Sequence, residues 1–525
     1  MQNQSEALDL FIIGGGINGC GIARDAAGRG YSVALAEMND LASATSSAST
    51  KLFHGGLRYL EFFEFRLVRE ALIEREILLQ AMPHISWPMR FVLPYHKDMR
   101  FESDTPTSKL LSFFMPWMKG RRPAWLIRFG LFLYDNLGGR KILPGTKSID
   151  LKTGPEGKPL VSRLERAFEY SDCWVEDSRL VVLNARDAQA RGAEINVKTK
   201  VVSAEFSDGL WSVTLEGPDN STRVVQAKML VNAGGPWVEN IIRHTARLNS
   251  TEGVRLVRGS HIVTKKLYDH DKCYFFQGED GRIIFSIPYE EDFTLIGTTD
   301  ADHGAPDVKP ECSAEESDYL IDFANGYFEQ NLSAEDIVWT YSGVRPLYND
   351  GASSATAATR EYVLRVNTSV GGPVLNVFGG KITTYRRLAE SALELIDTEF
   401  NRETEKWTAG ASMPGGDFPF NGVGDLRRQL AKMLPFLEDR TIRRLIRQYG
   451  TEAQAIFSGV SSPEDLGQDF GKGVFQRELD WAIENEWVRR GDDFIWRRSK
   501  LGLVLDEGSQ SAIDAYIQKQ VPLRD

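Results

Sequence analysis

The sequence predicts a mixed α/β fold: a Rossmann-like nucleotide-binding domain, an inserted domain with a mixed or antiparallel sheet, and a C-terminal α-helical domain. Three observations lead to this prediction. A β–α–β pattern opens the chain, short strand-like runs alternate with turns between 250 and 300, and amphipathic helical patterns dominate from about 400. At 525 residues the chain is too long for one compact core, so two or three domains are expected.

The opening segment has the three parts of a dinucleotide-binding unit. The apolar run LDLFII is typical of a buried parallel strand, and the small residues after it predict a closely packed helix that stops at Gly30. In Gly14-x-Gly16-x-x-Gly19, the glycines allow a tight turn, backbone approach to a pyrophosphate and close packing of the helix on the sheet. Glu37 ends the second strand, where it can accept hydrogen bonds from ribose hydroxyls. These residues alone do not decide between FAD and NAD.

The rest of the chain continues the pattern. EINVKTKVVSAEF, LWSVTLE and QAKMLVNAG predict further strands, and DLRRQLAKMLPFL predicts a helix with Leu426, Leu430, Met433, Leu434 and Leu437 on one face. We expect a discontinuous nucleotide-binding domain at roughly 1–80, 160–240 and 340–400, an inserted substrate domain at 81–159 and 241–339, and a helical domain at 401–525.

Composition excludes several classes of protein. A net charge of -11 argues against nucleic acid as the main partner. The four cysteines are scattered, so neither a disulfide framework nor a metal site is predicted. The polar N-terminus predicts no signal peptide, and no apolar run is long enough to predict a membrane-spanning helix.

Several segments combine glycine with a cationic or polar side chain near the end of a strand or turn. They are TKLFHGGLRYLE (50–61), LVNAGGPW (230–237), RGSHIV (258–263), YSGVRPLY (341–348) and VFGGKITTYRRL (377–388). Taken singly, most of these cations are expected to be solvated surface charges. Arg345 is the exception, because it stands between a glycine-containing turn and a proline, outside any helical surface.

These segments, in this order, resemble the FAD-dependent glycerol-3-phosphate dehydrogenases of the respiratory type, within the D-amino-acid-oxidase-like flavoproteins. The resemblance is carried by FIIGGGINGCGIARDAAGRG, SSASTKLFHGGLRYLE, FEYSDCWVEDSRL, GSHIV, IGTTD, IVWTYSGVRPL, VFGGKITTYRRLAE and WRRSKLGL. It implies FAD as cofactor, oxidation of sn-glycerol 3-phosphate to dihydroxyacetone phosphate, hydride transfer from C2 to flavin N5, and electron transfer to a membrane quinone.

The resemblance also implies which residues hold the cofactor. Polar residues and glycines of the later segments are expected to bind the cofactor together with the fingerprint residues. The N-terminus of the helix after Lys381 is expected to point at the flavin and to stabilise negative charge on it. The added residues are Ser46, Ser47, Ser49, Thr50, Gly234, Gly379, Gly380, Lys381 and Thr383.

A phosphomonoester substrate is a dianion and needs cations that turns hold in place. Arg58 and Lys381 are the candidates for the phosphate, with Tyr59 and Thr384 as hydrogen-bond donors. Arg345 is placed nearer the reacting carbinol, where it could polarise the oxygen or anchor the phosphate.

Removal of the C2 hydroxyl proton needs an acceptor whose pKa lies near the working pH, which histidine supplies most readily. His54 and His261 both stand in motifs of the resemblance. A lone histidine is more often structural, but the glycines around His54 favour a catalytic role. His261 could instead shape the pocket or share the proton, so the choice stays open.

A basic, aromatic segment suggests contact with a membrane surface. Between 97 and 141 nine Lys/Arg face four Asp/Glu, giving +5, and the part at 109–141 is rich in Phe, Trp, Leu and Met. This pattern favours an element in the interface of an anionic leaflet over a core element with a solvated rim. We expect a cytoplasmic protein bound peripherally to the inner membrane; the apparent insertion at 99–122 could extend the anchor or serve a homodimer contact.

Other readings remain open. A glycine- or sarcosine-type amine oxidase of the same fold needs one arginine for a carboxylate rather than a cluster of cations. A glycerophosphate oxidase would pass its electrons to oxygen. A flavin-binding sensor would need no base beside the cofactor. Paired arginines in the tail, among them Arg497-Arg498, are expected on solvated faces or in inter-domain ion pairs.

Overall fold

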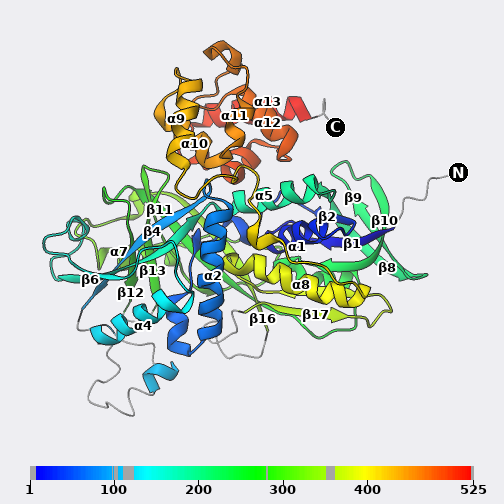
Figure 1. Ribbon diagram of the computed structural model, residues 1–525, viewed down its shortest axis with the longest axis horizontal. Helices are drawn as coiled ribbons and strands as arrows, with labels where there is room; N and C mark the ends of the chain where they lie inside the picture. Colours follow the sequence, from blue (N-terminus) through cyan, green and yellow to red (C-terminus); the bar gives the residue numbers. More distant parts are fainter. Residues whose placement is uncertain are drawn as a thin grey trace.

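The computed structural model describes residues 7–96, 99, 105–109, 123–278, 282–349 and 361–521. Two β-sheets lie side by side in this part of the chain, and a C-terminal group of helices packs against them (Figure 1). The predicted fold class is confirmed in each of its three parts.

The first sheet carries the nucleotide-binding unit. Its path is β17-β18-β10-β1-β2-β7, with the β8–β9 hairpin attached to β10, and the pairings among β18, β10, β1, β2 and β7 are parallel. The carboxyl ends of these strands therefore meet at one edge, where ligands bind in open α/β sheets. The strands of this sheet are β1 (Leu8–Ile13), β2 (Val33–Glu37), β7 (Glu194–Val197), β8 (Lys200–Ser207), β9 (Leu210–Glu216), β10 (Thr222–Asn232), β17 (Val363–Asn367) and β18 (Val374–Phe378).

Three helices cover one face of this sheet. α1 (Ile17–Gly28) packs between α5 (Asp177–Ala190) and α8 (Tyr385–Phe400), as Figure 1 shows. Leu10 and Ile12 of the sheet and Ile22 of α1 are fully buried in the core between them. This packing fixes the start of α1 at the carboxyl edge of the sheet.

The second sheet is mixed. Its path is β15-β11-β14-β13-β12-β4-β6-β3, with β16 on β11 and β5 on β6; β12 and β4 are parallel, and the strands between 250 and 300 are antiparallel, as expected. Its strands are β3 (Leu52–Phe53), β4 (Ser86–Tyr95), β5 (Lys147–Asp150), β6 (Arg166–Val175), β11 (Val254–Lys265), β12 (Cys273–Gln277), β13 (Ile283–Tyr289), β14 (Phe293–Gly297), β15 (Ala301–Asp302) and β16 (Ile337–Tyr348).

One predicted strand is wrong in its extent. EINVKTKVVSAEF forms two strands, β7 and β8, because Lys198 adopts a left-handed φ of 57° and turns the chain between them. Sheet membership also cuts across the expected domain ranges, since β6 and β16 belong to the second sheet. The domain boundaries themselves stay a prediction.

The tail has helical cores of its own. In α9, Leu426 and Leu430 are buried, and the helix ends at Met433, two residues before Pro435, where proline disfavours helical backbone. The remaining helices are α2 (Phe65–Ala81), α4 (Ala124–Leu137), α6 (Val238–Asn240), α7 (Ala314–Asn325), α9 (Val423–Met433), α10 (Asp439–Tyr449), α11 (Glu452–Ile456), α12 (Gln476–Asn485) and α13 (Glu507–Gln520). Among the described residues, every helix is too short or too polar to cross a bilayer.

Candidate active site

A cavity of about 940 Å³ opens at the carboxyl edge of the first sheet and reaches the second sheet. Glu37 and Gly234 line it from the first sheet, whereas His261, Phe285 and Arg345 line it from the second. The cavity therefore joins the fingerprint to the histidine and arginine motifs that lie far from it in the sequence.

The fingerprint glycines stand where side chains have no room. Gly14 has a φ of 114°, and a Cβ on it would lie 2.5 Å from the Ala233 carbonyl oxygen. A Cβ on Gly19 would lie 2.0 Å from the Gly14 carbonyl oxygen, so Gly19 serves packing and does not line the cavity. Gly16 lines the cavity directly before the twelve-residue α1, which presents its N-terminus there. A helix N-terminus without an obstructing side chain fits a pyrophosphate.

Glu37 lines the cavity at the end of β2. Its Oε2 accepts the Gly15 N–H at 2.7 Å and its Oε1 accepts the Asn39 N–H at 2.8 Å, so the carboxylate is held rigidly. Burial raises the pKa of the Glu37 carboxyl above its ordinary value. Each oxygen can accept a further hydrogen bond from a ribose hydroxyl.

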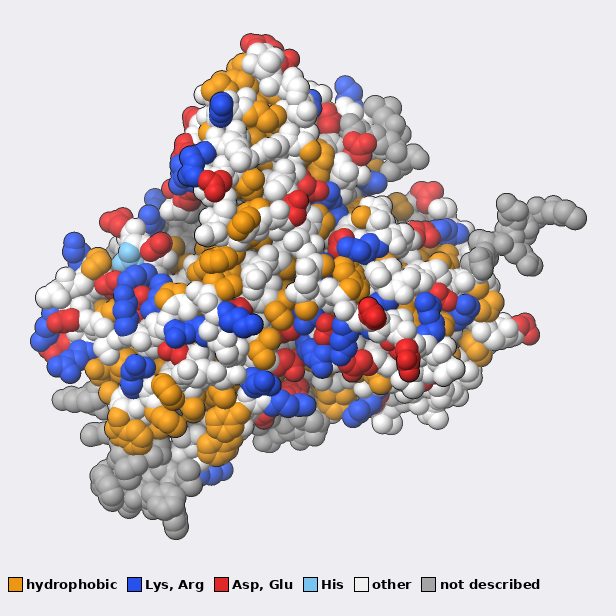
Figure 2. All heavy atoms as spheres, in the orientation of Figure 1, with side chains coloured by type: hydrophobic (Ala, Val, Ile, Leu, Met, Phe, Trp, Pro, Cys, Tyr) orange, Lys and Arg blue, Asp and Glu red, His pale blue; other side chains and the backbone are white. Residues whose placement is uncertain are grey.

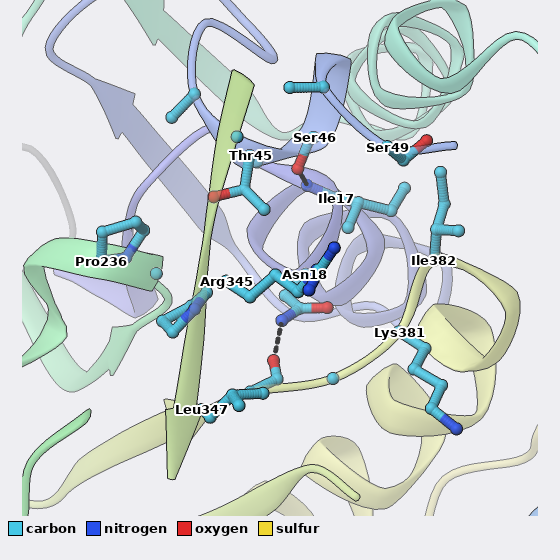
Figure 3. A pocket seen from close by; sticks show the side chains of 18 of the residues that line it. Ile17, Asn18, Thr45, Ser46, Ser49, Pro236, Arg345, Leu347, Lys381 and Ile382 are labelled. Carbon is cyan, nitrogen blue, oxygen red and sulfur yellow. Dashed lines mark hydrogen bonds between the residues drawn. The ribbon is translucent and has the colours of Figure 1, made fainter. Parts of the chain in front are cut away.

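The serine- and threonine-rich loop after β2 lies over the start of α1 (Figure 3). The Ser46 hydroxyl accepts the Ile17 N–H at 3.0 Å, and the Thr45 hydroxyl donates to the Val344 carbonyl at 2.5 Å. Both residues line the cavity, as do Ser49 and Thr50, whereas Ser47 lies outside its lining.

The loop after β18 approaches the same place from the other side. Asn18 donates through Nδ2 to the Gly379 carbonyl at 3.0 Å, which ties α1 to this loop (Figure 3). Gly379 and Gly380 adopt φ values of 67° and 100° and line the cavity with Lys381 and Thr383. Thr384 is buried at the start of α8 and does not line it.

The segment with His54 is an irregular turn rather than the start of an α-helix. After β3, Gly56 adopts a left-handed φ of 72° and residues Leu57–Phe62 form a 3₁₀ helix, so that α2 begins only at Phe65. The half-buried His54 lines the cavity, and its backbone N–H donates to the Thr383 hydroxyl at 3.2 Å. This bond joins the His54 segment to the loop after β18.

His261 is almost fully buried on β11. Its Nε2 lies 3.0 Å from the Thr50 hydroxyl, and its ring stacks on Tyr341 with the centroids 4.7 Å apart. Burial, with the positive charges of Arg345 and Lys51, holds the pKa of His261 well below its ordinary value of 6.5. The ring is therefore neutral at physiological pH and holds a proton poorly.

Three predicted cations line the same cavity: Arg58, Arg345 and Lys381. The Lys381 ammonium lies 3.6 Å from the centre of the Tyr59 ring, a cation–π contact that fixes its direction. Arg345 forms an ion pair with Asp300 and donates to the Thr298 hydroxyl at 3.2 Å. Asp300 offsets the charge of Arg345, and Arg58 and Lys381 bring two further positive charges to the cavity lining, which also holds Glu37.

Sequence reasoning missed a buried ion pair beneath the loop. Lys51 Nζ lies 2.7 Å from Asp177 Oδ1, and both side chains are fully buried. Asp177 also accepts the Ser49 hydroxyl at 2.7 Å, so it orients a cavity residue. A lysine next to buried strand residues in STKLF was the available signal, because such a charge requires a partner.

The fold and site define a flavoprotein oxidoreductase, and the chain belongs to the FAD-dependent oxidoreductase family. The family model described as FAD dependent oxidoreductase matches residues 9–386, and a model of the C-terminal domain of alpha-glycerophosphate oxidase matches 407–518. FAD is accordingly the cofactor, and the glycine turn, the α1 N-terminus and Glu37 described above fit its nucleotide half.

Similar proteins cover nearly the whole chain. A glycerol-3-phosphate dehydrogenase of Pseudomonas aeruginosa is 46% identical over 99% of this chain and 97% of that protein. A D-erythritol 1-phosphate dehydrogenase of Brucella abortus is 45% identical over 97% of each. The structure of the glycerol-3-phosphate dehydrogenase of Bacillus halodurans complexed with FAD aligns with a TM-score of 0.73 at 25% identity, covering 99% of this chain and 95% of that one.

Proposed function

We propose that this protein oxidises sn-glycerol 3-phosphate to dihydroxyacetone phosphate and delivers the electrons to a membrane quinone. The observation that carries the proposal is one cavity, continuous with the FAD site, that is lined by His54 and by three cations, Arg58, Arg345 and Lys381. Relatives that match nearly the full chain are named glycerol-3-phosphate dehydrogenases, which agrees with this chemistry. FAD accepts the hydride from C2 when it is bound.

The phosphate is assigned to Arg58 and Lys381. A dianion is bound most strongly by charge-assisted hydrogen bonds from cations that are already held in position. The Tyr59 ring holds the Lys381 ammonium, and both residues belong to segments joined by the bond from His54 N–H to Thr383. Arg345 is assigned to the carbinol end, where its pair with Asp300 fixes the guanidinium.

His54 is assigned as the base that accepts the proton of the C2 hydroxyl. His261 is a weak base here because burial and neighbouring cations keep it neutral, and its Nε2 already meets Thr50. His54 is half-buried, lines the cavity and packs its ring edge-on against Phe285, with the centroids 6.4 Å apart. In this assignment His261 and Tyr341 shape the wall of the pocket.

Contact with the membrane is assigned to α4. Trp125, Phe129 and Phe132 are 57%, 52% and 55% exposed, and their spacing places them on one face of the helix. Figure 2 shows hydrophobic side chains gathered in this region, at the lower left where Figure 1 places α4. The opposite face, with Ile127 and Leu131, is buried. Such a helix suits the interface of a bilayer, at the cytoplasmic face where a quinone is accessible.

A flavin-bleaching experiment tests the reaction. Purified holoenzyme is mixed anaerobically with glycerol 3-phosphate, D-erythritol 1-phosphate, glycine or sarcosine, and the flavin absorbance is followed. We expect the fastest bleaching with glycerol 3-phosphate, and faster reoxidation by a quinone analogue than by oxygen. Bleaching by an amine alone would overturn the proposal, whereas preference for the erythritol phosphate would replace the substrate and keep the chemistry.

A further inference from the structure

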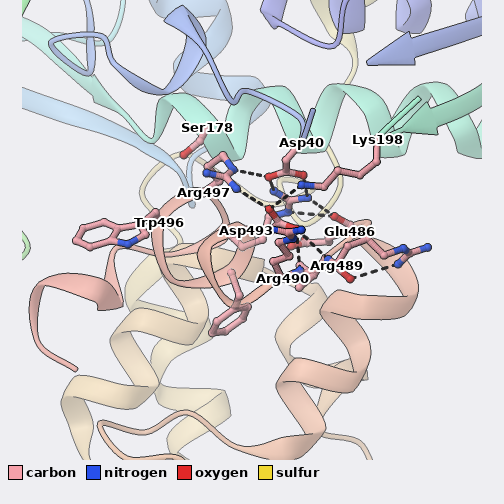
Figure 4. A network of polar contacts seen from close by, with 12 residues as sticks. Asp40, Ser178, Lys198, Glu486, Arg489, Arg490, Asp493, Trp496 and Arg497 are labelled. Carbon is pink, nitrogen blue, oxygen red and sulfur yellow. Dashed lines mark hydrogen bonds and ion pairs between the residues drawn. The ribbon is translucent and has the colours of Figure 1, made fainter. Parts of the chain in front are cut away.

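One short segment of the C-terminal domain contacts the loop that follows β2 in the nucleotide-binding half of the molecule. In the π-helical turn Asp493–Arg498, the Arg498 guanidinium binds Asp40 through two bonds, from Nη1 to Oδ2 at 2.6 Å and from Nη2 to Oδ1 at 2.8 Å. Arg497 Nε adds a third contact to Asp40 Oδ2 at 2.5 Å. Figure 4 shows the Asp40 side chain pointing from the nucleotide-binding part of the molecule toward this segment of the C-terminal domain.

This ion pair is fully withdrawn from water. The Asp40 and Arg498 side chains are 1% and 0% exposed. The two guanidinium groups hold the pKa of Asp40 below its ordinary value despite its burial. A buried carboxylate without its partners is strongly unfavourable, so undocking of the tail segment would destabilise the loop that bears Asp40.

Asp40 stands at the back of the loop that forms one wall of the cofactor cavity. Residues 37–39 and 42–43 on either side of it line the cavity, whereas Asp40 and the buried Leu41 do not. The loop turns at Ala42, which has a left-handed φ of 59° and donates its N–H to the Gly15 carbonyl at 3.2 Å. The Asp40 carboxylate therefore binds the tail segment from the side of the loop opposite to the side that lines the cavity.

A second ion pair, between Lys198 and Asp493, joins the same tail segment to the turn between β7 and β8. Lys198 Nζ lies 3.4 Å from Asp493 Oδ1, the oxygen that also accepts a bond from Arg497 at 2.5 Å. The Lys198 N–H donates to the Asn39 carbonyl at 2.9 Å, and Thr199 lines the cavity beside it. Figure 4 shows Lys198 and Asp40 converging on this part of the tail.

We propose that Arg497, Arg498 and Asp493 are positioning residues for FAD: they clamp the 37–43 and 198–199 loops from behind and so preform the nucleotide end of the site. None of the three lines the cavity or touches the reacting atoms. The clamp acts on cofactor affinity, and linkage requires the reverse effect, in which bound FAD stabilises the docked tail segment by the same factor.

The test compares two carboxylate-to-amide variants. Asp40→Asn removes the negative charge that Arg497 and Arg498 bind. Glu452→Gln is the matched control, because Glu452 on α11 binds Arg186 on α5 at 2.7 and 2.9 Å and joins the same two parts of the molecule away from the cavity. Holoenzymes are stripped of FAD and titrated with FAD by flavin fluorescence, and kcat is measured at saturating FAD.

We expect Asp40→Asn to raise the FAD Kd about 5- to 150-fold, the usual range of coupling between sites. The control should stay within about twofold of wild type, and kcat at saturating FAD should be nearly unchanged in both. An unaltered Kd in Asp40→Asn, or an equal rise in Glu452→Gln, would overturn the proposal.

Two further measurements cover the case in which Asp40→Asn does not fold. Lys198→Gln removes only the partly exposed ion pair with Asp493 and should raise the FAD Kd by a smaller factor. In wild type, FAD should slow amide hydrogen exchange in 493–498 relative to the apoprotein, and leave exchange around the exposed Arg427–Asp439 pair of the tail unaffected. Equal exchange at 493–498 with and without FAD would contradict the clamp.

Discussion

At the scale of single residues, burial separates the two candidate histidines. His261 is enclosed and paired with Thr50, whereas His54 is half-buried and lines the cavity beside the loop that carries Lys381. A proton acceptor must reach its substrate and must also release the proton afterwards. The two histidines should therefore respond differently to substitution.

His54→Ala should lower kcat by about 10²- to 10⁴-fold, the usual contribution of general base catalysis, with a smaller change in KM. The measurement is kcat against pH with a soluble acceptor. His261→Gln, which keeps a polar contact toward Thr50, should leave the shape of that profile unchanged. If His54→Ala instead retained the wild-type kcat across the whole pH range, His54 would not be the base.

Arg58→Ala and Lys381→Ala should act mainly on KM. Hydrogen bonds to charged groups contribute about 1.5–3 kcal/mol, so each change should raise KM for glycerol 3-phosphate by roughly 10- to 150-fold. Inhibition by inorganic phosphate should weaken in parallel, because the same cations would bind that anion. A fall in kcat with unchanged KM would move these residues away from the phosphate.

At the scale of elements, α4 has two faces with separate tasks. Its exposed face carries Trp125, Phe129 and Phe132, and its buried face carries Tyr134. The Tyr134 hydroxyl accepts the Gly55 N–H at 2.7 Å and donates to Asp172, which Arg75 binds at 2.6 Å. The helix that presents an apolar surface therefore also supports the turn next to His54.

Replacing Trp125, Phe129 and Phe132 together by Gln should reduce co-sedimentation with anionic lipid vesicles about tenfold or more, since each aromatic side chain contributes burial in the interface. KM for glycerol 3-phosphate with a soluble dye acceptor should not change. Val224→Gln, an equally exposed apolar site on β10, serves as the control. Undiminished sedimentation of the triple variant would exclude this face as the anchor.

Elements with a local signature were predictable from the sequence, and long-range partnerships were not. The fingerprint, the glycine turn before α8 and the helical face of α9 follow from spacing within a few residues. The pairs Lys51–Asp177 and Asp40–Arg498 join residues 126 and 458 positions apart, and nothing in either local pattern names its partner. Most of the insertion at 99–122 and part of the basic segment lie outside the described residues, so those expectations stay predictions.

At the scale of the whole molecule, the junction between tail and body encloses His84. It is fully buried, and neither ring nitrogen has a hydrogen-bond partner within the described part of the chain. Burial, together with the charges of Arg179 and Arg447, holds the pKa of His84 well below its ordinary value of 6.5. The folded protein therefore keeps this ring neutral, whereas the unfolded chain protonates it in acid.

The free energy of unfolding should consequently fall as the pH drops below about 6.5, because there the unfolded state binds a proton that the folded state does not bind. The slope is up to about 1.4 kcal/mol per pH unit for each such histidine. Above that pH the term vanishes. His84→Leu, which removes no side-chain hydrogen bond made within the described residues, should reduce the pH dependence of stability by one proton. Urea midpoints of the holoenzyme between pH 5 and 7.5 measure this, and parallel curves for variant and wild type would refute it.

The position of the clamp along the chain has a consequence for biosynthesis. Ribosomes deliver the fingerprint at Gly14 long before Arg498, and domains fold as they emerge. The loop with Asp40 is therefore synthesised long before the arginines that bind its carboxylate. Tight binding of the cofactor should therefore follow the synthesis of Arg498, and chains truncated before Arg498 should be purified with little bound flavin.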